Sequence, residues 1–246
     1  MSIRKLTGIL AFVLITFNCL AQSNGVPAGM LIRTLYIKAG SKTGTSFLID
    51  YKGKSYLITA KHVVSDLPRK NATFQIFQLH DWKDVTADVM QPKNDEVDIA
   101  VLDPHWNTTP SDWNPELSSA GVNIGGQVYF LGYPFGLHGL FHAEYVPFVK
   151  HGVYSAVDGS DDTAVRMYVD GFNNEGFSGG PIVAFSNQKW QILGVIKGYY
   201  EEAAKTKLGG QSIDTKILVN SGILVGYSIK HALEAIDNTG AATSPK

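Results

Sequence analysis

The stretch Gly176-Phe-Ser-Gly-Gly-Pro181 leads into the apolar run Ile182 to Phe185, which is typical of a buried strand. Glycines around Ser178 allow a tight turn and let backbone N–H groups come close to a bound oxygen. The donors in such a turn are the N–H groups of Gly176 and Ser178. A glycine-rich turn between two strands fits this stretch equally well when it is taken alone, so other residues must decide.

Two further polar residues stand at the ends of expected strands. His62 follows Tyr56-Leu-Ile-Thr-Ala-Lys, where a buried strand is expected to end at the small residue Ala60. His62 then begins a short turn. Asp98 is the last acid before the apolar run Ile99-Ala-Val-Leu102. Taken singly, His62 could be interpreted as a histidine that only packs against its neighbours, and Asp98 as a carboxylate in the turn where a strand begins.

The joint order His62, Asp98, Ser178 favours catalytic chemistry. Serine is a poor nucleophile until a base takes its proton, and the base works only when an acid holds it in the right tautomer. We therefore interpret Ser178 as a nucleophile, His62 as its general base and Asp98 as the group that orients the histidine. The nucleophile elbow of an α/β-hydrolase needs a helix after the serine and the order Ser, Asp, His, whereas Gly179-Gly-Pro181 and a strand follow here.

Short runs rich in β-branched and aromatic residues, separated by Gly, Asn, Asp and Pro, predict an all-β fold. The expected strands are 31–37, 45–50, 55–59, 73–79, 99–102, 127–131, 152–157, 164–169, 181–185 and 191–196. A hairpin turn is expected between Asp50 and Ser55, because Gly53 can adopt a positive φ.

The stretch Pro104 to Gly126 has little periodicity and divides the chain into two halves of similar length. We expect an N-terminal β-barrel over residues 26–120 and a second barrel with a C-terminal helix over 121–237. The helix is predicted within Tyr227 to Ile236, where apolar residues recur at helical spacing and Ser228 is a candidate N-cap. Residues 238–246 are expected to be a disordered tail.

The N-terminus has the layout of a secretory signal peptide, with Arg4 and Lys5 before an apolar run and Ala21 as the expected last residue removed. This predicts a signal over residues 1–21 and a secreted or periplasmic protein. A retained membrane anchor is the competing interpretation, but the apolar run is short for a span. Cys19, the single cysteine of the chain, lies in this segment, so the processed protein would contain no disulfide.

The composition excludes several classes of function. The 246 residues are 44% hydrophobic and 17% charged with a formal net charge of −1, and no dense basic run is present, which argues against nucleic acid as a partner. His138 and His142 are spaced like helical metal ligands, but nearby glycines and proline indicate a loop and no third ligand is evident. We expect no metal, no cofactor and no stable membrane anchor after processing.

These motifs resemble those of the chymotrypsin superfamily of trypsin-like serine peptidases, from about Gly44 to Ala235. Thr59-Ala-Lys-His62 is similar to the family's Thr-Ala-x-His, and Asp98-Ile-Ala-Val-Leu102 to its Asp-Ile-Ala-Leu. Gly176-Phe-Ser-Gly-Gly-Pro181 resembles its Gly-Asp/Asn-Ser-Gly-Gly-Pro. The stretches 128–136 and 149–156 resemble segments of bacterial HtrA-like peptidases most closely.

The resemblance implies two packed six-stranded antiparallel barrels, a catalytic triad in the cleft between them, and a C-terminal helix. Phe177 stands where the animal enzymes keep an aspartate that pairs with a freed N-terminus, so zymogen activation of that kind is not expected. The disulfides of the animal enzymes are absent, and we expect no PDZ domain because the chain ends shortly after the helix.

The same resemblance predicts substrate-binding residues. Phe172 would lie at the base of the primary specificity pocket, and Lys197, Gly198 and Tyr199 would form the edge that pairs with the substrate backbone. No acid stands at Phe172, so no preference for Lys or Arg is expected. An acidic side chain near Lys197 and a small or apolar side chain are the two alternatives for the residue before the scissile bond. Core packing is the other interpretation of Phe172 and Tyr199.

The expected activity is hydrolysis of peptide bonds through an acyl-enzyme, with proteins or peptides as substrates. One alternative is a non-catalytic protein that keeps the double-barrel cleft to bind peptides, suggested by Phe177 and the atypical pocket. Another is a peptidase whose loop Asn173-Asn-Glu-Gly176 becomes active only when a partner or substrate remodels it.

Overall fold

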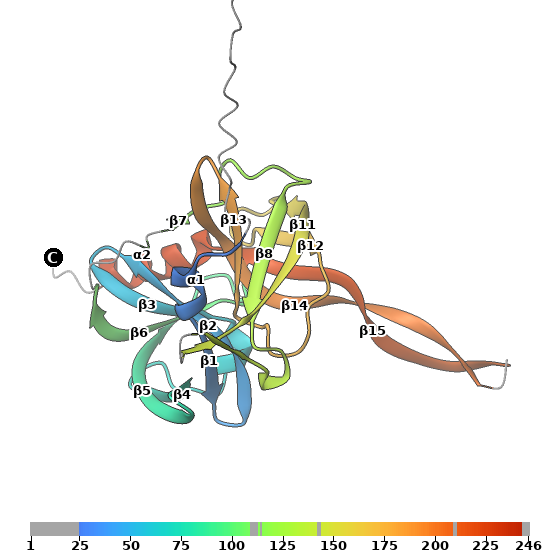
Figure 1. Cartoon of the computed structure of the whole chain (residues 1–246), viewed down its shortest axis with the longest axis horizontal. Coiled ribbons are helices and arrows are strands. Elements are labelled where there is room, and N and C mark those ends of the chain that lie inside the picture. The colour runs from blue at the N-terminus through green and yellow to red at the C-terminus, as the bar shows by residue number, and fades with distance from the viewer. Residues whose placement is uncertain (1–24, 109–112, 114, 142–143, 209–210, 243–246) are drawn as a thin grey trace, which may run out of the picture.

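The structure, a computed structural model, describes residues 25–108, 113, 115–141, 144–208 and 211–242 (Figure 1). The expected signal segment and His142 lie outside this part of the chain. None of the helices within it has the length and apolar character of a membrane span.

The first half forms a closed barrel of six strands in the order β1-β2-β3-β6-β5-β4, with each neighbouring pair antiparallel. Its strands are β1 (Thr34–Ala39), β2 (Lys42–Tyr51), β3 (Lys54–Thr59), β4 (Ala72–Gln78), β5 (Asp81–Met90) and β6 (Ala100–Asn107). Gly53 adopts a positive φ of 80° in the β2–β3 turn, as the sequence predicts. Asn107 ends β6, so the connection between the halves begins later than the predicted Pro104.

The second half forms a ring of strands in the order β13-β8-β11-β12-β15-β14, which the pairing of β13 with β14 closes, while β7 (Glu116–Leu117) adds in parallel to β14. The ring strands are β8 (Gln127–Gly132), β11 (Phe148–Asp158), β12 (Arg166–Asp170), β13 (Pro181–Ser186), β14 (Lys189–Leu208) and β15 (Gln211–Ser228). The short pair β9 (Gly139–Phe141) and β10 (Glu144–Val146) lies outside it. The prediction of two six-stranded antiparallel barrels is confirmed.

Helices are few among the described residues. The elements are α1 (Ala28–Ile32), the 3₁₀ turns η1 (Lys61–Val64) and η2 (Pro134–Gly136), and α2 (Lys230–Ala242). Helix α2 occurs where the periodicity predicts it, and the Ser228 hydroxyl accepts a hydrogen bond from the Lys230 N–H at 3.4 Å. It continues past residue 237 into the stretch that the sequence predicts to be a disordered tail.

Apolar side chains form three cores. One fills the first barrel around Leu57 and Phe74, and another fills the second barrel around Phe130 and Phe177. The third lies between the barrels and includes Phe47 of β2, with residues of β3, β8, β13, β14 and α2. This shared core fixes the relative position of the barrels, so the loops at their junction have a defined geometry.

The strands β14 and β15 extend beyond the second barrel as a long two-stranded arm (Figure 1). Their register runs from Gly194↔Ser228 within the barrel to Leu208↔Gln211 near the tip. The sequence predicts only the strand 191–196 in this region, so the arm is a finding of the structure.

We expect the Leu57→Ala substitution to lower the free energy of unfolding by about 2–5 kcal/mol, because it leaves a cavity in the first core. Leu57 has 0% exposure. The matched control is Leu79→Ala at a side chain that is 70% exposed, which should change stability by less than about 0.5 kcal/mol. Urea denaturation followed by circular dichroism measures both, and equal effects would contradict the assignment of this core.

Candidate active site

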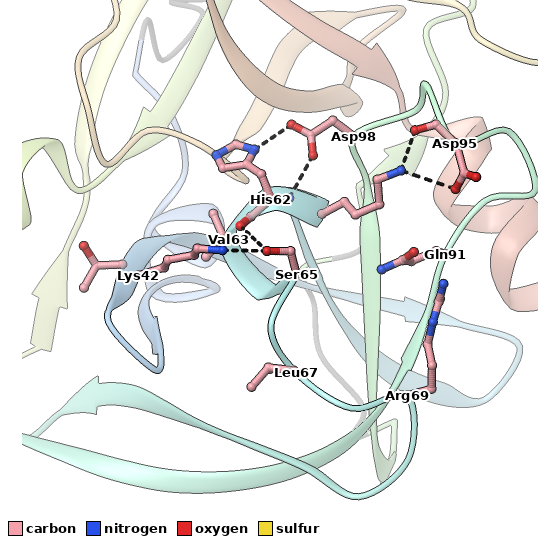
Figure 2. Close-up of a pocket in the computed structure, with 11 residues that line it drawn as sticks. Lys42, His62, Val63, Ser65, Leu67, Arg69, Gln91, Asp95 and Asp98 are labelled. Atoms are coloured by element: carbon pink, nitrogen blue, oxygen red, sulfur yellow. Dashed lines mark hydrogen bonds and ion pairs between the residues drawn. The ribbon is translucent and has the colours of Figure 1, made fainter.

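His62 and Asp98 lie side by side at the edge of the first barrel. His62 is in η1, directly after β3, and Asp98 lies in the segment that enters β6. The Asp98 Oδ2 atom is 2.6 Å from the His62 Nδ1 atom, and Asp98 Oδ1 accepts the His62 backbone N–H at 2.9 Å (Figure 2). An ionised carboxylate only accepts hydrogen bonds, so Nδ1 carries the proton and Nε2 is left as the basic nitrogen.

The Asp98 carboxylate is largely buried. Burial disfavours its charged form, but the hydrogen bonds from the His62 ring and backbone, together with the charges of His62 and Lys197, outweigh that cost and hold the pKa of Asp98 below its ordinary value. Asp98 therefore stays ionised at neutral pH and holds the imidazole in one orientation.

Ser178 lies in the loop between β12 and β13, partly exposed. Its hydroxyl donates a hydrogen bond to the Lys197 carbonyl on β14 at 3.1 Å. This bond joins two of the residues predicted for the site, but it directs the serine proton to a carbonyl and not to His62.

The backbone before Ser178 is shaped by glycine. Gly176 has φ +95°, and a Cβ atom there would lie 2.2 Å from the Tyr133 carbonyl oxygen, so only glycine fits. The neighbouring Glu175 carbonyl accepts the Phe135 N–H at 2.9 Å. In the described part of the chain, the N–H groups of Gly176 and Ser178 donate to no other residue, so both are available to a ligand oxygen.

Thr45 of β2 links the first barrel to this loop, although no motif of the sequence points to it. Its N–H donates to the Ser178 carbonyl at 2.8 Å, and its hydroxyl donates to the Gly176 carbonyl at 2.6 Å. The same hydroxyl accepts the Tyr133 N–H at 3.2 Å. A buried threonine in a strand carries no distinguishing sequence signal, so only the folded chain reveals its role.

Lys150 of β11 supports the loop from the second barrel, and it too is absent from the sequence-based predictions. Its ammonium donates to the Phe172 carbonyl at 2.7 Å and to Asn174 Oδ1 at 2.6 Å, and it lies 5.2 Å from the centre of the Phe177 ring. No acid pairs with it among the described residues, and burial lowers the pKa of its ammonium. Lys150 thus fixes both ends of the Phe172–Asn174 segment.

The predicted substrate-binding residues fall into two places. Phe172 is 54% exposed, which rules out core packing for its ring. Lys197, Gly198 and Tyr199 lie on β14 where the strand leaves the barrel, and Lys197 is exposed while Gly198 and Tyr199 are half-buried. Next to Phe172, the buried Asn173 keeps its Oδ1 atom without a hydrogen-bond partner.

A groove of about 760 Å³ adjoins the His62 side of the site (Figure 2). Its lining residues are Lys42, Thr43, Lys61, His62, Val63, Ser65, Leu67, Arg69, Gln91, Asp95 and Asp98. Three cationic side chains therefore surround the space beside His62. Lys42 is bound to Ser65 and Asp66, and Lys61 to the Asp95 carbonyl.

The described residues contain no cluster of three or more potential metal-ligating side chains. The His138 ring packs edge-on against Tyr145, with 4.3 Å between the ring centres, and also contacts Phe77. His138 is therefore part of an aromatic cluster on the surface.

The chain forms two closed antiparallel barrels around a shared core, and a histidine, an acid and a glycine-flanked serine lie at their junction. This arrangement defines the chymotrypsin-like class of fold. The sequence matches the trypsin-like peptidase domain family over residues 44–195, and the chain belongs to that family. A search of curated proteins finds no match to this chain.

Solved structures agree with this fold. The Rv3671c protease in its inactive form matches with 19% identity and a TM-score of 0.55 over 91% of this chain and 96% of that one. A Ser343Ala mutant of Rv3671c from M. tuberculosis H37Rv, also in its inactive form, gives 19% identity and a TM-score of 0.53 over 89% and 92%. The HtrA-type protease AlgW with a tripeptide gives 21% identity and a TM-score of 0.54, over 85% of this chain and 60% of AlgW.

The Asp98→Asn variant tests the charge of the buried pair through pH. Because the pKa of Asp98 is lower in the folded than in the unfolded chain, where it is about 3.9, its contribution is complete above about pH 5 and is lost as pH falls through the folded pKa. We expect the wild type to exceed the variant in stability by about 1.5–3 kcal/mol at pH 6, with a smaller gap at pH 3. Urea denaturation at both pH values measures it, and a constant gap would contradict an ionised Asp98.

The Thr45→Val variant keeps the side-chain shape and removes the hydroxyl that bonds Gly176. We expect a loss of about 1–3 kcal/mol in stability, since two buried backbone groups lose a partner. Amide hydrogen exchange should also become faster over residues 175–178. Thr43→Val, at an exposed position of the same strand, is the control, and unchanged exchange in Thr45→Val would refute the link between the barrels.

Proposed function

We propose that this protein is a serine endopeptidase in which Ser178, His62 and Asp98 form the catalytic triad. The observation that carries the proposal is the His62–Asp98 pair, with 2.6 Å between Nδ1 and Oδ2. This pair lies at the same barrel junction as Ser178 in its glycine-rich loop. Membership of the trypsin-like peptidase family supports a peptidase acting on proteins or peptides.

The chemistry follows from these positions. Ser178 Oγ attacks the scissile carbonyl carbon while His62 Nε2 takes its proton, and the new oxyanion accepts the N–H groups of Gly176 and Ser178. The C–N bond then breaks as His62 returns the proton to the leaving amine. A water molecule, deprotonated by His62, hydrolyses the acyl-enzyme and restores the Ser178 hydroxyl, while Asp98 stabilises the imidazolium in both halves of the reaction.

The hydrogen bond from Ser178 Oγ to the Lys197 carbonyl gives the mechanism a preparatory step. The hydroxyl must leave this carbonyl and turn to His62 before it can be deprotonated. The same bond favours a second candidate function, a peptide-binding protein or a peptidase that a substrate or partner activates by releasing Ser178. Activity that depends on added partner or long peptide would distinguish this second candidate.

We also propose that the enzyme acts outside the cytoplasm, either secreted or in the periplasm. The support is the layout of residues 1–21, which has the pattern of a secretory signal peptide. A chain without disulfides depends on its three cores for stability in such a compartment.

Labelling with a fluorophosphonate tests the nucleophile directly. We expect the reagent to modify the wild type at Ser178 and to leave Ser178→Ala unmodified, and cleavage of unfolded casein should fall by about 10⁴–10⁶-fold in Ser178→Ala. The control is Ser160→Ala, at an exposed turn, which should keep full labelling and cleavage. A wild-type protein that is folded, unlabelled and inactive, also with long peptides present, would refute a triad peptidase.

A further inference from the structure

A row of aromatic rings leads from the serine loop to the outside of the first barrel. Tyr133, whose N–H bonds the Thr45 hydroxyl, stacks on Tyr36 of β1 with 5.4 Å between the ring centres. The Tyr36 ring lies 5.0 Å from that of Trp82 in β5, and the Trp82 ring lies 5.1 Å from that of Phe77 in β4. The row therefore begins at the Thr45 side of the serine loop and ends on the first barrel.

The connection between β8 and β11 packs on the end of this row. The Tyr145 ring of β10 lies 5.0 Å from that of Phe77, and the His138 ring contacts both of them. The Tyr145 hydroxyl is hydrogen-bonded to His80 Nδ1 in the turn between β4 and β5. These contacts join a turn of the first barrel and a loop of the second barrel into one surface.

Large apolar side chains extend from this surface into solvent. Leu79, next to His80, is 70% exposed, and Phe135, Leu137 and Leu140 of the β8–β11 connection are 66%, 55% and 64% exposed. We call these four side chains, with the rings that adjoin them, the aromatic surface. Gathered apolar side chains of this kind mark sites of interaction on a protein.

The stretch that supplies most of the aromatic surface has no formal charge. Residues 133–141, Tyr-Pro-Phe-Gly-Leu-His-Gly-Leu-Phe, contain no aspartate, glutamate, lysine or arginine. A partner of this stretch is therefore recognised by apolar and aromatic packing and not by ion pairs.

Two of the exposed side chains are held on strained backbone. Leu79 has φ +50° and Phe135 has φ +53°, in the left-handed region that large side chains rarely adopt. Such conformations cost free energy and persist only where the surrounding structure imposes them. Strained backbone that presents a leucine and a phenylalanine to water favours a binding role for both.

The aromatic surface is continuous with the candidate active site. The Phe135 N–H donates to the Glu175 carbonyl at 2.9 Å, and Glu175 lies three residues before Ser178. Gly136 packs against Tyr36, since a Cβ atom at Gly136 would lie 2.9 Å from the Tyr36 hydroxyl. An extended chain rises by about 3.3 Å per residue, so a polypeptide held at Ser178 needs only a few further residues to reach this surface.

We propose that the aromatic surface is an exosite, a binding surface outside the catalytic cleft, that holds apolar segments of an unfolded polypeptide substrate while another segment lies at Ser178. This inference rests on the proposed peptidase function. The occupant is the substrate because a chain bound at Ser178 is already beside the surface, which gives its other segments a high effective concentration there.

The exosite selects substrates by their folding state. Folded proteins bury most of their large apolar side chains, whereas unfolded chains expose them. A long unfolded chain can occupy the cleft and the aromatic surface together and gains affinity from both, but a short peptide occupies only one of them. The substrate class is therefore unfolded polypeptide with segments rich in leucine and aromatic residues.

Peptide binding to the full-length Ser178→Ala protein tests the surface without cleavage. The probes are fluorescein-labelled peptides of four Leu-Ser-Phe-Gly repeats or of four Thr-Ser-Asn-Gly repeats, followed by fluorescence anisotropy. We expect the apolar peptide to bind about tenfold more tightly than the polar one. Adding Leu79→Ser, Leu137→Ser and Leu140→Ser should remove most of this difference, because these substitutions delete the apolar contacts.

The matched control carries Ile32→Ser, Ile124→Ser and Leu218→Ser, which replace three exposed apolar side chains elsewhere on the protein. It should keep the tenfold preference for the apolar peptide. Circular dichroism of both triple variants shows whether they retain the fold.

Cleavage of unfolded casein by the otherwise wild-type protein tests the exosite in the reaction. We expect the triple variant of the aromatic surface to lose about tenfold in kcat/KM, and the loss to appear in KM and not in kcat. The reason is that an exosite contact is the same in the ground state and in the transition state. The triple control should keep the KM of the wild type.

Equal affinities for the two peptides, or equal losses in the surface variant and the control, would overturn the inference. Co-sedimentation with vesicles of phosphatidylcholine and phosphatidylglycerol, and sedimentation velocity, test other occupants. If the surface variant loses vesicle binding or a dimer while its peptide affinities are unchanged, the surface serves a lipid or a second copy and the inference is wrong.

The proposed function fails separately. A wild-type protein that prefers the apolar peptide through this surface but cuts no casein would refute the peptidase and leave the binding surface standing. A protein that cuts casein with the same KM in the surface variant and in the wild type would refute the exosite and leave the peptidase standing.

Discussion

The arrangement of the candidate site depends on the bonds that Thr45 makes across the barrel junction. Its hydroxyl and its backbone N–H hold the carbonyls of Gly176 and Ser178, in the two peptide units whose own N–H groups donate to the Asn174 and Ile196 carbonyls. These units alternate with the two that carry the N–H groups of Gly176 and Ser178, whose carbonyls, of Glu175 and Phe177, accept the N–H groups of Phe135 and Gly180. The first barrel therefore supplies His62 and Asp98 and also determines the backbone geometry around a serine of the second barrel.

The second barrel provides the complementary support. The Lys150 ammonium donates hydrogen bonds to the Phe172 carbonyl and to the Asn174 side-chain oxygen, and it has no counter-ion among the described residues. The dipoles of these two groups therefore compensate its partly buried charge. Phe177 is fully buried in the second core. The loop is thus held by the Thr45 hydroxyl of the first barrel and by the Lys150 ammonium and the buried Phe177 ring of the second barrel.

The sequence predicts the barrels, the terminal helix and the positions of His62, Asp98 and Ser178 because each depends on local signals: β-branched runs, glycine turns and residues at strand ends. Thr45 and Lys150 escape prediction because their importance comes from contacts between distant segments. The arm escapes because residues 201–207, Glu-Glu-Ala-Ala-Lys-Thr-Lys, lack the alternation that burial imposes on a strand. The orientation of the Ser178 hydroxyl is a side-chain rotation that no pattern of residues encodes.

The bond between Thr45 and Gly176 joins residues 131 positions apart, which has a consequence for folding order. Contacts at such separation form late, since closing the intervening chain costs entropy that only docked barrels repay. The strands of the first barrel end at Asn107, well before Ser178 in the chain. The serine loop takes its final geometry only when both barrels are docked, so a chain in which one barrel alone has folded does not carry the finished site.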